Sequence, residues 1–429
     1  MTELKLKQEL KMRGLLKQYT HEELFDLYEK WGQTLYIGMD PTADSLHLWN
    51  FVGFLHAVQY MKRNNKLIFI VWGATWMIGD PWGKDSERTF LSKEILAHNI
   101  QKIHQQVWIL LKNISDITWK LFEYEIMNNA EFYKNMWYLD FLREVWKHIT
   151  VNAMIKKETV KKRVEDTDKS ISYTEFSYML IQGYDFVKLF LEHGCKLQIA
   201  WSDQWWNVVT GIELGRKIAN EQLYGVTTPL VLDSSGKKFG KSEWNALWLS
   251  PEKNSPYSIY QYFFNTTDTD VEAYLKLFSF LSEDEIIKIV SEHKKAPEER
   301  IGQQKIAYHI TEIIFGTREA EGCVHSTETL FKTWIVNVIR TNTTEQNIQL
   351  RQATWSQISK QKRILELLVD SHICWSNSSA KKDIKQWLIY INEEKVNDIS
   401  YEYNTSDILQ DTYIYIQRGK KNKVLVKID

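Results

Sequence analysis

Short apolar runs alternate with longer amphipathic segments over the first 240 residues of the chain. Residues 34–37 and 67–71 are typical of buried strands, and residues 46–63 between them are long enough for a helix. Further strands are expected at residues 197–200 and 229–232, and further helices at residues 174–195 and 207–219. Because strands and helices alternate, we predict an α/β fold in which residues 1–240 form a doubly wound, Rossmann-like domain.

The remaining segments predict other kinds of structure. Leucines at helical spacing predict two helices within residues 1–30, the second opened by a capping box that begins at Thr20. Residues 241–340 lack strand signals and are predicted to form a helical domain, and the Thr-, Asn- and Gln-rich residues 341–361 a linker. Residues 362–429 predict a small α+β domain. Its helices are expected at residues 364–369 and 379–386, and its strands at residues 387–392, 413–417 and 423–428.

The composition is that of an ordinary globular protein. Of 429 residues, 44% are hydrophobic and 25% charged, with a formal net charge of −1, which excludes a largely disordered or uniformly basic chain. The three cysteines lie too far apart for a disulfide framework or a Cys-x-x-Cys metal site. No stretch approaches the roughly 20 apolar residues of a membrane span. We expect a cytoplasmic protein with packed, unreactive cysteines and no metal site of its own.

Two loops follow the first two predicted strands. Residues 38–50 lie between the first strand and its helix, where the carboxyl edge of a parallel sheet and a helix N-terminus favour phosphate binding. His47 in this loop is equally consistent with a helix cap. Residues 73–84 carry Asp80 and Lys84 in a turn that either contacts a ligand or is simply solvated, and their spacing is not that of a P-loop.

Two further patterns carry polar groups that could serve a ligand. Residues 236–242 hold three lysines between glycines, and flexible ammonium groups can follow charge onto a leaving polyphosphate, although such a run alone is typical of a surface loop. Tyr178, Gln182 and Asp185 stand at i, i+4 and i+7 of a predicted apolar helix. This stripe indicates either a pocket for a small zwitterion with a further hydrogen-bonding group or a solvated face.

Taken in order, these motifs resemble those of bacterial tyrosyl-tRNA synthetases, which are class I aminoacyl-tRNA synthetases. The resemblance spans nearly the whole chain, and its motifs are residues 34–47, Ser202-Asp-Gln-Trp205, Lys238-Phe-Gly-Lys-Ser242 and residues 255–261. Residues 379–384 and 396–398 are similar to the S4 RNA-binding domain that often ends this family. The resemblance therefore implies a Rossmann-like catalytic domain, a helical domain and an S4-like domain.

The same resemblance implies a tyrosine-tRNA ligase, which forms tyrosyl-adenylate from L-tyrosine and ATP and passes the tyrosyl group to tRNA(Tyr). It implies Mg²⁺ that travels with ATP, no tightly bound cofactor, and a homodimer. Asn50 stands where many members have a second histidine. The residues implied in catalysis are Thr42, His47, Asn50, Lys238 and Lys241, and those implied in ATP binding are Asp40, His47, Asp203 and Lys241.

The resemblance also assigns the tyrosine pocket. Tyr36 and Asp185 would bond the phenolic hydroxyl, and Gln204 would lie near the reacting carboxyl group. The ammonium group would be held by Asp80, Tyr178 and Gln182. A site built to bond a substrate hydroxyl strongly rejects an analogue that lacks it, so the implied enzyme distinguishes tyrosine from phenylalanine.

Binding of tRNA needs positive surface, and two clusters of basic residues could supply it. One cluster comprises Lys156, Lys157, Lys161, Lys162 and Arg163. The other comprises Arg418, Lys420, Lys421, Lys423 and Lys427, with no acid among residues 413–427. Either could be a solvated face, but the S4-like context favours tRNA binding by the second.

Tryptophan is the departure from ordinary composition. Glycine and tryptophan each occur 18 times, so glycine is scarce, at about 4% against a usual share of about 7%. Six tryptophans stand where the family has glycine, namely Trp49, Trp72, Trp76, Trp146, Trp201 and Trp206, with Trp244, Trp375 and Trp387 as further candidates. Indoles at Trp49 or Trp201 would fill nucleotide or substrate space in a close-packed site.

We hypothesise that UGA codons have been translated as tryptophan here and are read as glycine by the source organism. If about 12 to 15 tryptophans were glycine, the glycine share would rise to about 7 to 8%, which is ordinary. Trp205 and Trp248 fall where the family has tryptophan. Two alternatives stay open: a catalytically inactive RNA-binding relative with a tryptophan-filled ATP site, and a synthetase for another amino acid such as tryptophan.

Overall fold

The computed structural model divides the chain into two compact units. Unit 1 comprises residues 1–254 and 264–314, and unit 2 comprises residues 255–263 and 315–429. The structure describes residues 4–76, 78, 92–157, 160–161, 171–230, 247–331, 357–358, 363–371, 373–374, 376–409, 413–419 and 422–428. None of the helices in these ranges combines the length and apolar character needed to cross a bilayer.

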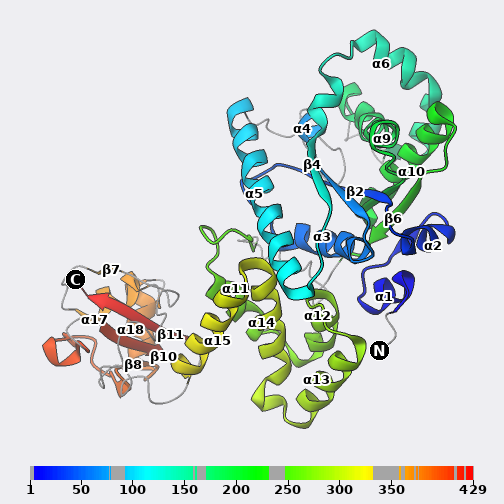
Figure 1. Cartoon of the computed structure of the whole chain (residues 1–429). Coiled ribbons are helices and arrows are strands. Elements are labelled where there is room, and N and C mark those ends of the chain that lie inside the picture. Colours follow the sequence, from blue (N-terminus) through cyan, green and yellow to red (C-terminus); the bar gives the residue numbers. More distant parts are fainter. Residues whose placement is uncertain are drawn as a thin grey trace. The chain divides into compact units, whose positions relative to one another are not determined.

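Unit 1 is built on a six-stranded sheet (Figure 1). Across the sheet the strands are β1 (Gln18–Tyr19), β6 (Tyr224–Thr228), β5 (Leu197–Trp201), β2 (Thr34–Met39), β3 (Lys66–Val71) and β4 (Tyr124–Asn128). β1 is antiparallel to β6, and the other five strands run parallel. Numbered along the chain, the parallel strands lie in the order 3-2-1-4-5 of doubly wound dinucleotide-binding folds. The predicted fold class is confirmed.

The two faces of the sheet are covered by different helices, because successive side chains of a strand point to opposite faces. α3 (Leu48–Met61) packs on the face of Ile37, where a Cβ placed on Gly53 would lie 3.2 Å from the Ile37 side chain. α9 (Tyr173–His193) packs on the opposite face, where the rings of Tyr36 and Phe186 are 5.1 Å apart. α10 (Trp205–Leu214) lies beside α9, and α5 (Lys93–Thr118) lies on the other side of the sheet (Figure 1).

Several details of unit 1 differ from the sequence-based prediction. The last parallel strand is β6, at Tyr224–Thr228, whereas Pro229 and Leu230 of the predicted strand 229–232 are not in a strand and residues 231–232 lie outside the described residues. β4 was not predicted, because Tyr124–Asn128 has polar side chains and lies half-buried at the sheet edge. The capping box at Thr20 does not form, because Thr20 pairs with Gly225 of the sheet.

Eight further helices in the described part of unit 1 precede, separate or follow the strands along the chain. They are α1 (Leu6–Met12), α2 (Glu23–Glu29), α4 (Gly73–Trp76), α6 (Tyr138–Glu144), α7 (Val151–Ile155), α12 (Val271–Phe278), α13 (Glu283–Lys295) and α14 (Ile301–Phe315). Arg13, after α1, donates hydrogen bonds to the carbonyls of Lys276, Ser279 and Leu281. The N-terminal segment is thereby tied to the end of α12.

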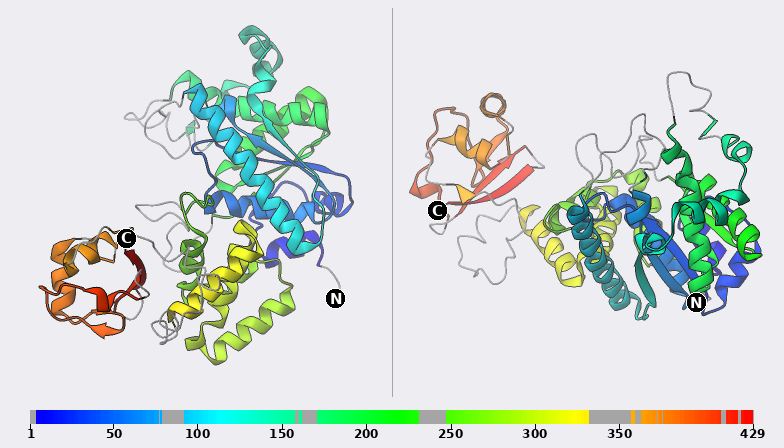
Figure 2. Two further views of the ribbon diagram at one scale, coloured as in Figure 1. Left: turned by 60° about the vertical axis from the view of Figure 1, so that its left-hand side comes forward. Right: turned by 90° about the horizontal axis from the view of Figure 1, so that it is seen from above.

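Unit 2 contains α11 (Pro256–Phe264), α15 (Thr317–Phe331) and a small α+β domain (Figure 2). The sheet of this domain has the strand order β7 (Gln357–Ile358), β11 (Asn422–Ile428), β10 (Tyr413–Arg418), β8 (Ile389–Ile391) and β9 (Glu394–Lys395). α17 (Ile364–Asp370) and α18 (Asn377–Lys385) share one buried apolar core with β8, β10 and β11. The helices and strands predicted after residue 362 are confirmed, and the end of the segment predicted as a linker contributes β7.

A buried ion cluster joins α1 to α3 at the amino end of the sheet. The Glu9 carboxylate accepts hydrogen bonds from Arg13 Nε at 3.1 Å, Lys62 Nζ at 2.7 Å and Arg63 Nη1 at 3.1 Å. Burial alone would raise the pKa of Glu9, but the charges of Lys62 and Arg13 outweigh it and lower this pKa to about 2. Glu9 is therefore ionised in the folded protein and is matched by three cations.

We expect Glu9→Gln to lower the free energy of unfolding at pH 7 by about 3 kcal/mol, because it leaves buried cations without a counter-charge. Since the folded pKa is depressed, the stabilisation is present above the ordinary pKa of 4.5 and is lost as the pH falls towards 2. Denaturant titrations of both proteins between these pH values measure the effect. Glu22→Gln, which removes an exposed ion pair with Lys7, serves as control and should leave stability near wild type. Equal acid sensitivity of wild type and Glu9→Gln would contradict the assignment.

Candidate active site

The order of the parallel strands reverses between β2 and β5, which pair directly through residues 35–37 and 197–199. Ligands of open α/β sheets bind outside the carboxyl ends of the strands at such a switch point. Asp40 follows β2, and a short turn at Ser202–Gln204, which holds Asp203, follows β5. The fold therefore brings the predicted residues of both loops to one edge of the sheet.

His47 opens α3 at this edge and is held in a reciprocal cap. The backbone N–H of Asn50 donates to His47 Nδ1 at 3.1 Å, and the backbone N–H of His47 donates to Asn50 Oδ1 at 3.1 Å. Because Nδ1 accepts this bond, the ring proton of neutral His47 is on Nε2. Both interpretations of His47 are thus compatible, because the cap uses Nδ1 and places the ring proton on Nε2. Thr42 is exposed in the loop before it.

The segment that follows residues 231–246 is anchored beside His47. The Leu48 N–H donates to the Leu247 carbonyl at 2.8 Å, and the Leu249 N–H donates to the Leu46 carbonyl at 2.9 Å. Between them, the Trp248 ring lies 5.8 Å from the His47 ring. Lys238 and Lys241 fall outside the described residues, which resume at Leu247 beside the start of α3.

Tyr36 lies in the interior on the α9 face of β2. It is fully buried, and within the described part of the chain its hydroxyl has no hydrogen-bond partner. Burial, reinforced by Cys195 and Asp185, raises the pKa of Tyr36 well above its ordinary value. A buried hydroxyl without a partner is costly, and such a group is satisfied when a ligand supplies the missing bond.

Asp185 faces Tyr36 from α9 and has two partners that the sequence did not reveal. Asn129 Nδ2 donates to it at 2.9 Å, and Tyr133 Oη donates at 2.6 Å. Burial raises the pKa of Asp185 to about 8, although these two hydrogen bonds act to lower it. Asn129 and Tyr133 follow β4, so recognising that strand would have placed them at the carboxyl edge.

Tyr178 and Gln182 complete the polar stripe of α9. With Asp185 they are buried, with exposed fractions of 4%, 4% and 0%, so the interpretation as a solvated face is wrong. Within the described structure, Gln182 Oε1 has no hydrogen-bond partner. Tyr36 and Gln182 therefore present two unsatisfied polar atoms on the α9 face, which is the face predicted to bind an amino acid.

Comparison with known proteins gives the family. The family described as tRNA synthetases class I (W and Y) matches residues 32–332, and the tyrosine-tRNA ligase SYY-like C-terminal domain matches residues 346–426. The chain belongs to the class I tryptophan and tyrosine tRNA synthetases. The family resemblance inferred from the motifs is confirmed.

Relatives support this membership over the whole chain. Tyrosine-tRNA ligase 1 of Streptococcus thermophilus is 39% identical over 422 residues, covering 98% of this chain and 99% of the relative. Tyrosine-tRNA ligase of Streptococcus gordonii is 39% identical over 416 residues, covering 96% and 97%. A C-terminally truncated mitochondrial tyrosyl-tRNA synthetase of Aspergillus nidulans has a TM-score of 0.69 at 28% identity, covering 77% of this chain and 95% of that chain.

Other predicted residues of this synthetase lie away from the switch point or outside the described residues. Asp80, Lys420 and Lys421 are outside them, and of Lys423 only the backbone, in β11, is described. Arg418 Nη2 lies 2.9 Å from Asp383, and its Nη1 donates to the Ile373 carbonyl at 3.2 Å. The Arg418 side chain links β10 to α18 through this ion pair and is only partly exposed.

The first basic cluster is not a uniform charged surface. Lys156 is exposed, but Lys157 is buried and its ammonium donates to Thr210 of α10. Burial lowers the pKa of Lys157 to about 8. Lys157 therefore supports the packing of α10, and its contribution to a positive surface is small.

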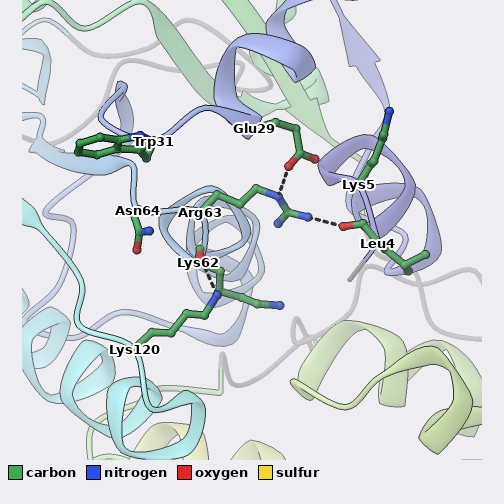
Figure 3. A pocket seen from close by; sticks show the side chains of 8 residues that line it. All are labelled: Leu4, Lys5, Glu29, Trp31, Lys62, Arg63, Asn64 and Lys120. Atoms are coloured by element: carbon green, nitrogen blue, oxygen red, sulfur yellow. Dashed lines mark hydrogen bonds and ion pairs between the residues drawn. The ribbon is translucent and has the colours of Figure 1, made fainter. Parts of the chain in front are cut away.

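A hollow of about 600 Å³ lies at the opposite, amino end of the sheet (Figure 3). Figure 3 shows Arg63 reaching Glu29, and Lys120 donates to the Lys62 carbonyl at 2.8 Å. The hollow is separate from the switch point, because Asn64 in its wall precedes β3. No group of three His, Cys, Asp or Glu in the described ranges is arranged to hold a metal ion.

We expect Asp185 to make the folded state less stable as the pH rises. Its folded pKa of about 8 exceeds the ordinary value of 3.8, so the native protein retains a proton that the unfolded chain releases. Stability relative to Asp185→Asn should therefore fall by about 1.4 kcal/mol per pH unit between about pH 5 and pH 7. Unfolding titrations measure it, with the exposed Asp116→Asn as control. A difference independent of pH would refute the shift.

Proposed function

We propose that this chain is a tyrosine-tRNA ligase, which activates L-tyrosine with ATP and transfers it to tRNA(Tyr). The observation that carries the proposal is the buried pair of Tyr36 and Asp185 below the β2–β5 switch point, where the Tyr36 hydroxyl has no partner among the described residues and could bond a polar ligand. Relatives named tyrosine-tRNA ligase cover 98% of the chain. A phenol is the part of an aromatic amino acid that such a pair can recognise.

The first step joins tyrosine to the nucleotide. The tyrosine carboxylate attacks the α-phosphorus of ATP, a carboxyl-oxygen-to-phosphorus bond forms, and the bond to the β-phosphate oxygen breaks to release pyrophosphate. In the second step a ribose hydroxyl at the tRNA 3′ end attacks the carbonyl carbon, and AMP leaves. Neither step requires a covalent enzyme intermediate, so the protein contributes alignment and stabilisation of charge.

The α9 face is suited to the amino acid. Tyr36 and Asp185 would bond the phenolic oxygen, and Tyr178 and Gln182 stand further along the same helix for the ammonium group. Asp80 would complete the ammonium site, and Gln204 would lie beside the carboxylate. The burial of these groups strengthens each hydrogen bond and makes the lack of one costly.

The α3 face is suited to the nucleotide. His47 Nε2 and the first N–H groups of α3 would donate to phosphate oxygens, with Thr42 and Asn50 beside them. Asp40 and Asp203 would contact the adenosine part, and Lys238 and Lys241 would neutralise the leaving pyrophosphate. The substrate would be ATP with its Mg²⁺ ion, whose charge offsets that of the phosphates.

Unit 2 is proposed to hold tRNA through its C-terminal domain. Lys420, Lys421 and Lys423 would contact phosphates, whereas Arg418 would act mainly by fixing β10. A homodimer and a cytoplasmic location are part of the proposal, because the family resemblance implies the first and the sequence predicts the second.

Two alternatives make different predictions in one assay, the tyrosine-dependent exchange of pyrophosphate into ATP. The assay is run on the chain with the present sequence and on a chain with glycine at the six family-glycine positions. Tyrosine-dependent exchange by either form supports the proposal. Exchange only with tryptophan would identify a synthetase for that amino acid, and tRNA binding without exchange by either form would identify a non-catalytic relative. The stacked rings of Trp49 and Trp201 at the switch point are the reason for testing this last candidate.

We expect Tyr36→Phe to weaken recognition of the substrate hydroxyl. Tyrosyl-tRNA synthetases are themselves the standard example of this kind of discrimination, about 10⁵ against phenylalanine. Loss of one hydrogen bond should lower kcat/KM for tyrosine by about 10- to 100-fold and leave that for phenylalanine nearly unchanged. Tyr60→Phe is the matched control, since Tyr60 is also buried with a hydroxyl that lacks a partner in the described structure. Equal effects of the two variants would argue against the pocket.

His47→Asn separates capping from catalysis. Asparagine is a good N-cap, so the free energy of unfolding should change by less than about 0.5 kcal/mol. The loss of the Nε2 donor should lower the exchange rate by about 10²- to 10³-fold, the usual effect of removing one donor to developing charge. His47→Ala, which removes both functions, should lose activity and about 1 kcal/mol of stability. Full activity of His47→Asn would limit His47 to a structural role.

A further inference from the structure

Two helices end on a tryptophan whose backbone is left-handed. After α5, Trp119 has φ 56° and ψ 30°, and its N–H donates to the Ser115 carbonyl at 2.8 Å. After α18, Trp387 has φ 61°, and its N–H donates to the Ile384 carbonyl at 3.0 Å. The next N–H, of Leu388, donates to the Asp383 carbonyl at 3.0 Å, which completes a Schellman motif.

These are positions at which helices place glycine, because a Cβ strains the left-handed backbone. In the same protein Gly194 has φ 64° after α9, and Gly316 has φ 94° after α14. Seven described residues other than glycine have positive φ; three are asparagine, which tolerates this region, and two are these tryptophans. Two tryptophans therefore have a left-handed backbone, which the Cβ of a large aromatic residue disfavours.

Packing does not compensate for this strain. The side chain of Trp119 is 93% exposed and that of Trp387 is 52% exposed. Lys395 Nζ lies 4.7 Å from the centre of the Trp387 ring, a contact that is worth little at such an exposed site. An exposed indole gains little burial energy, so neither side chain provides a physical reason for its position.

Three other indoles fill the candidate active site. On the nucleotide face, the rings of Trp49 and Trp201 are stacked with centroids 4.6 Å apart, at the start of α3 and the end of β5. On the amino acid face, the Trp72 ring lies so close to Gly38 that a Cβ on that glycine would come within 1.9 Å of it. Trp72 thus occupies the space between Tyr36 and the carboxyl edge, with its ring 6.4 Å from that of Tyr36.

We infer that positions 49, 72, 119, 201 and 387 are glycine in the protein that the source organism makes. Positions 119 and 387 need glycine for backbone reasons that have nothing to do with catalysis, and positions 49, 72 and 201 need it to leave room for substrates. One cause, a codon that the organism reads as glycine, accounts for both sets. The backbone at Trp119 is new support, because this position was not among those suggested by family resemblance.

Two other tryptophans of the described ranges carry no such sign. Trp248 is integrated in the site: its N–H donates to Asn254 Oδ1 at 2.7 Å, it pairs with His47, and Lys253 Nζ lies 5.4 Å from its ring. The Trp146 ring is stacked on that of Tyr173 at 5.5 Å, which is ordinary aromatic packing. Trp248 and Trp146 are thus packed, and the structure gives no reason for glycine at position 146, where the family resemblance had suggested it.

The codons and the native protein test the inference without reference to activity. In the gene of the source organism we expect TGA codons, which are UGA in the mRNA, at positions 49, 72, 119, 201 and 387. At position 248 we expect TGG, which is UGG in the mRNA. In the protein isolated from that organism, mass spectrometry of the peptides that contain positions 119 and 387 should give glycine. UGG at these two positions would overturn the inference, and so would UGA codons with tryptophan in the peptides. Neither result depends on ligase activity, so the proposed function and this inference can fail separately.

Stability provides a second measurement on the full-length chain. Trp119→Gly and Trp387→Gly should each raise the midpoint of thermal unfolding of their unit by about 2 °C or more, because strain is relieved and little packing is lost. Trp248→Gly, which removes a packed side chain, is the matched control and should lower the midpoint. A fall in the midpoint for both Trp119→Gly and Trp387→Gly would show that these tryptophans are accommodated and would overturn the inference.

Discussion

The direct pairing of β2 with β5 is the constraint on which the rest of the structure depends. β2 and β5 are the first and fourth parallel strands along the chain. The connections that follow them run to opposite sides of the sheet, which leaves a crevice at their carboxyl ends. α3 then covers one face and α9 the other, so one side of the crevice receives a helix N-terminus and the other a row of buried polar side chains. The helix N-terminus and the row of buried polar side chains are thereby separated by a single layer of backbone.

Burial strengthens any hydrogen bond that the polar groups of this crevice make, and it lowers the stability of the fold where such a bond is missing. Tyr36 and Gln182 hold atoms that lack partners within the described residues, and Asp185 retains its proton to unusually high pH because its surroundings disfavour charge. Each such group reduces the net free energy of folding unless a ligand or solvent supplies the missing bond. The Glu9 cluster at the amino end of the sheet has the opposite effect on folding. Its buried charges are matched, and they stabilise the contact between α1 and α3.

Periodicity predicted most of the fold because most strands are buried on both faces. β2, β3 and β5 stand out as apolar runs, whereas β4 lies at the edge, is half-buried, and escaped recognition with the residues behind it. Asn129 and Tyr133 could not be found for the same reason. Their role depends on where β4 ends in space, and no local pattern of side chains encodes that. Thr20 illustrates the reverse error, because a sheet contact displaced its local capping preference.

The free volume around a glycine position decides whether the fold can hold an indole there. A close-packed interior has no spare volume for an indole, so replacing a core glycine would displace helices and strands. Two locations are exceptions: the solvent beyond a helix end and the space reserved for a substrate. Trp119 and Trp387 are exposed beyond helix ends, and Trp49, Trp72 and Trp201 lie at the candidate site near the carboxyl edge of the sheet. The indoles at the candidate site therefore leave the order and pairing of the strands intact.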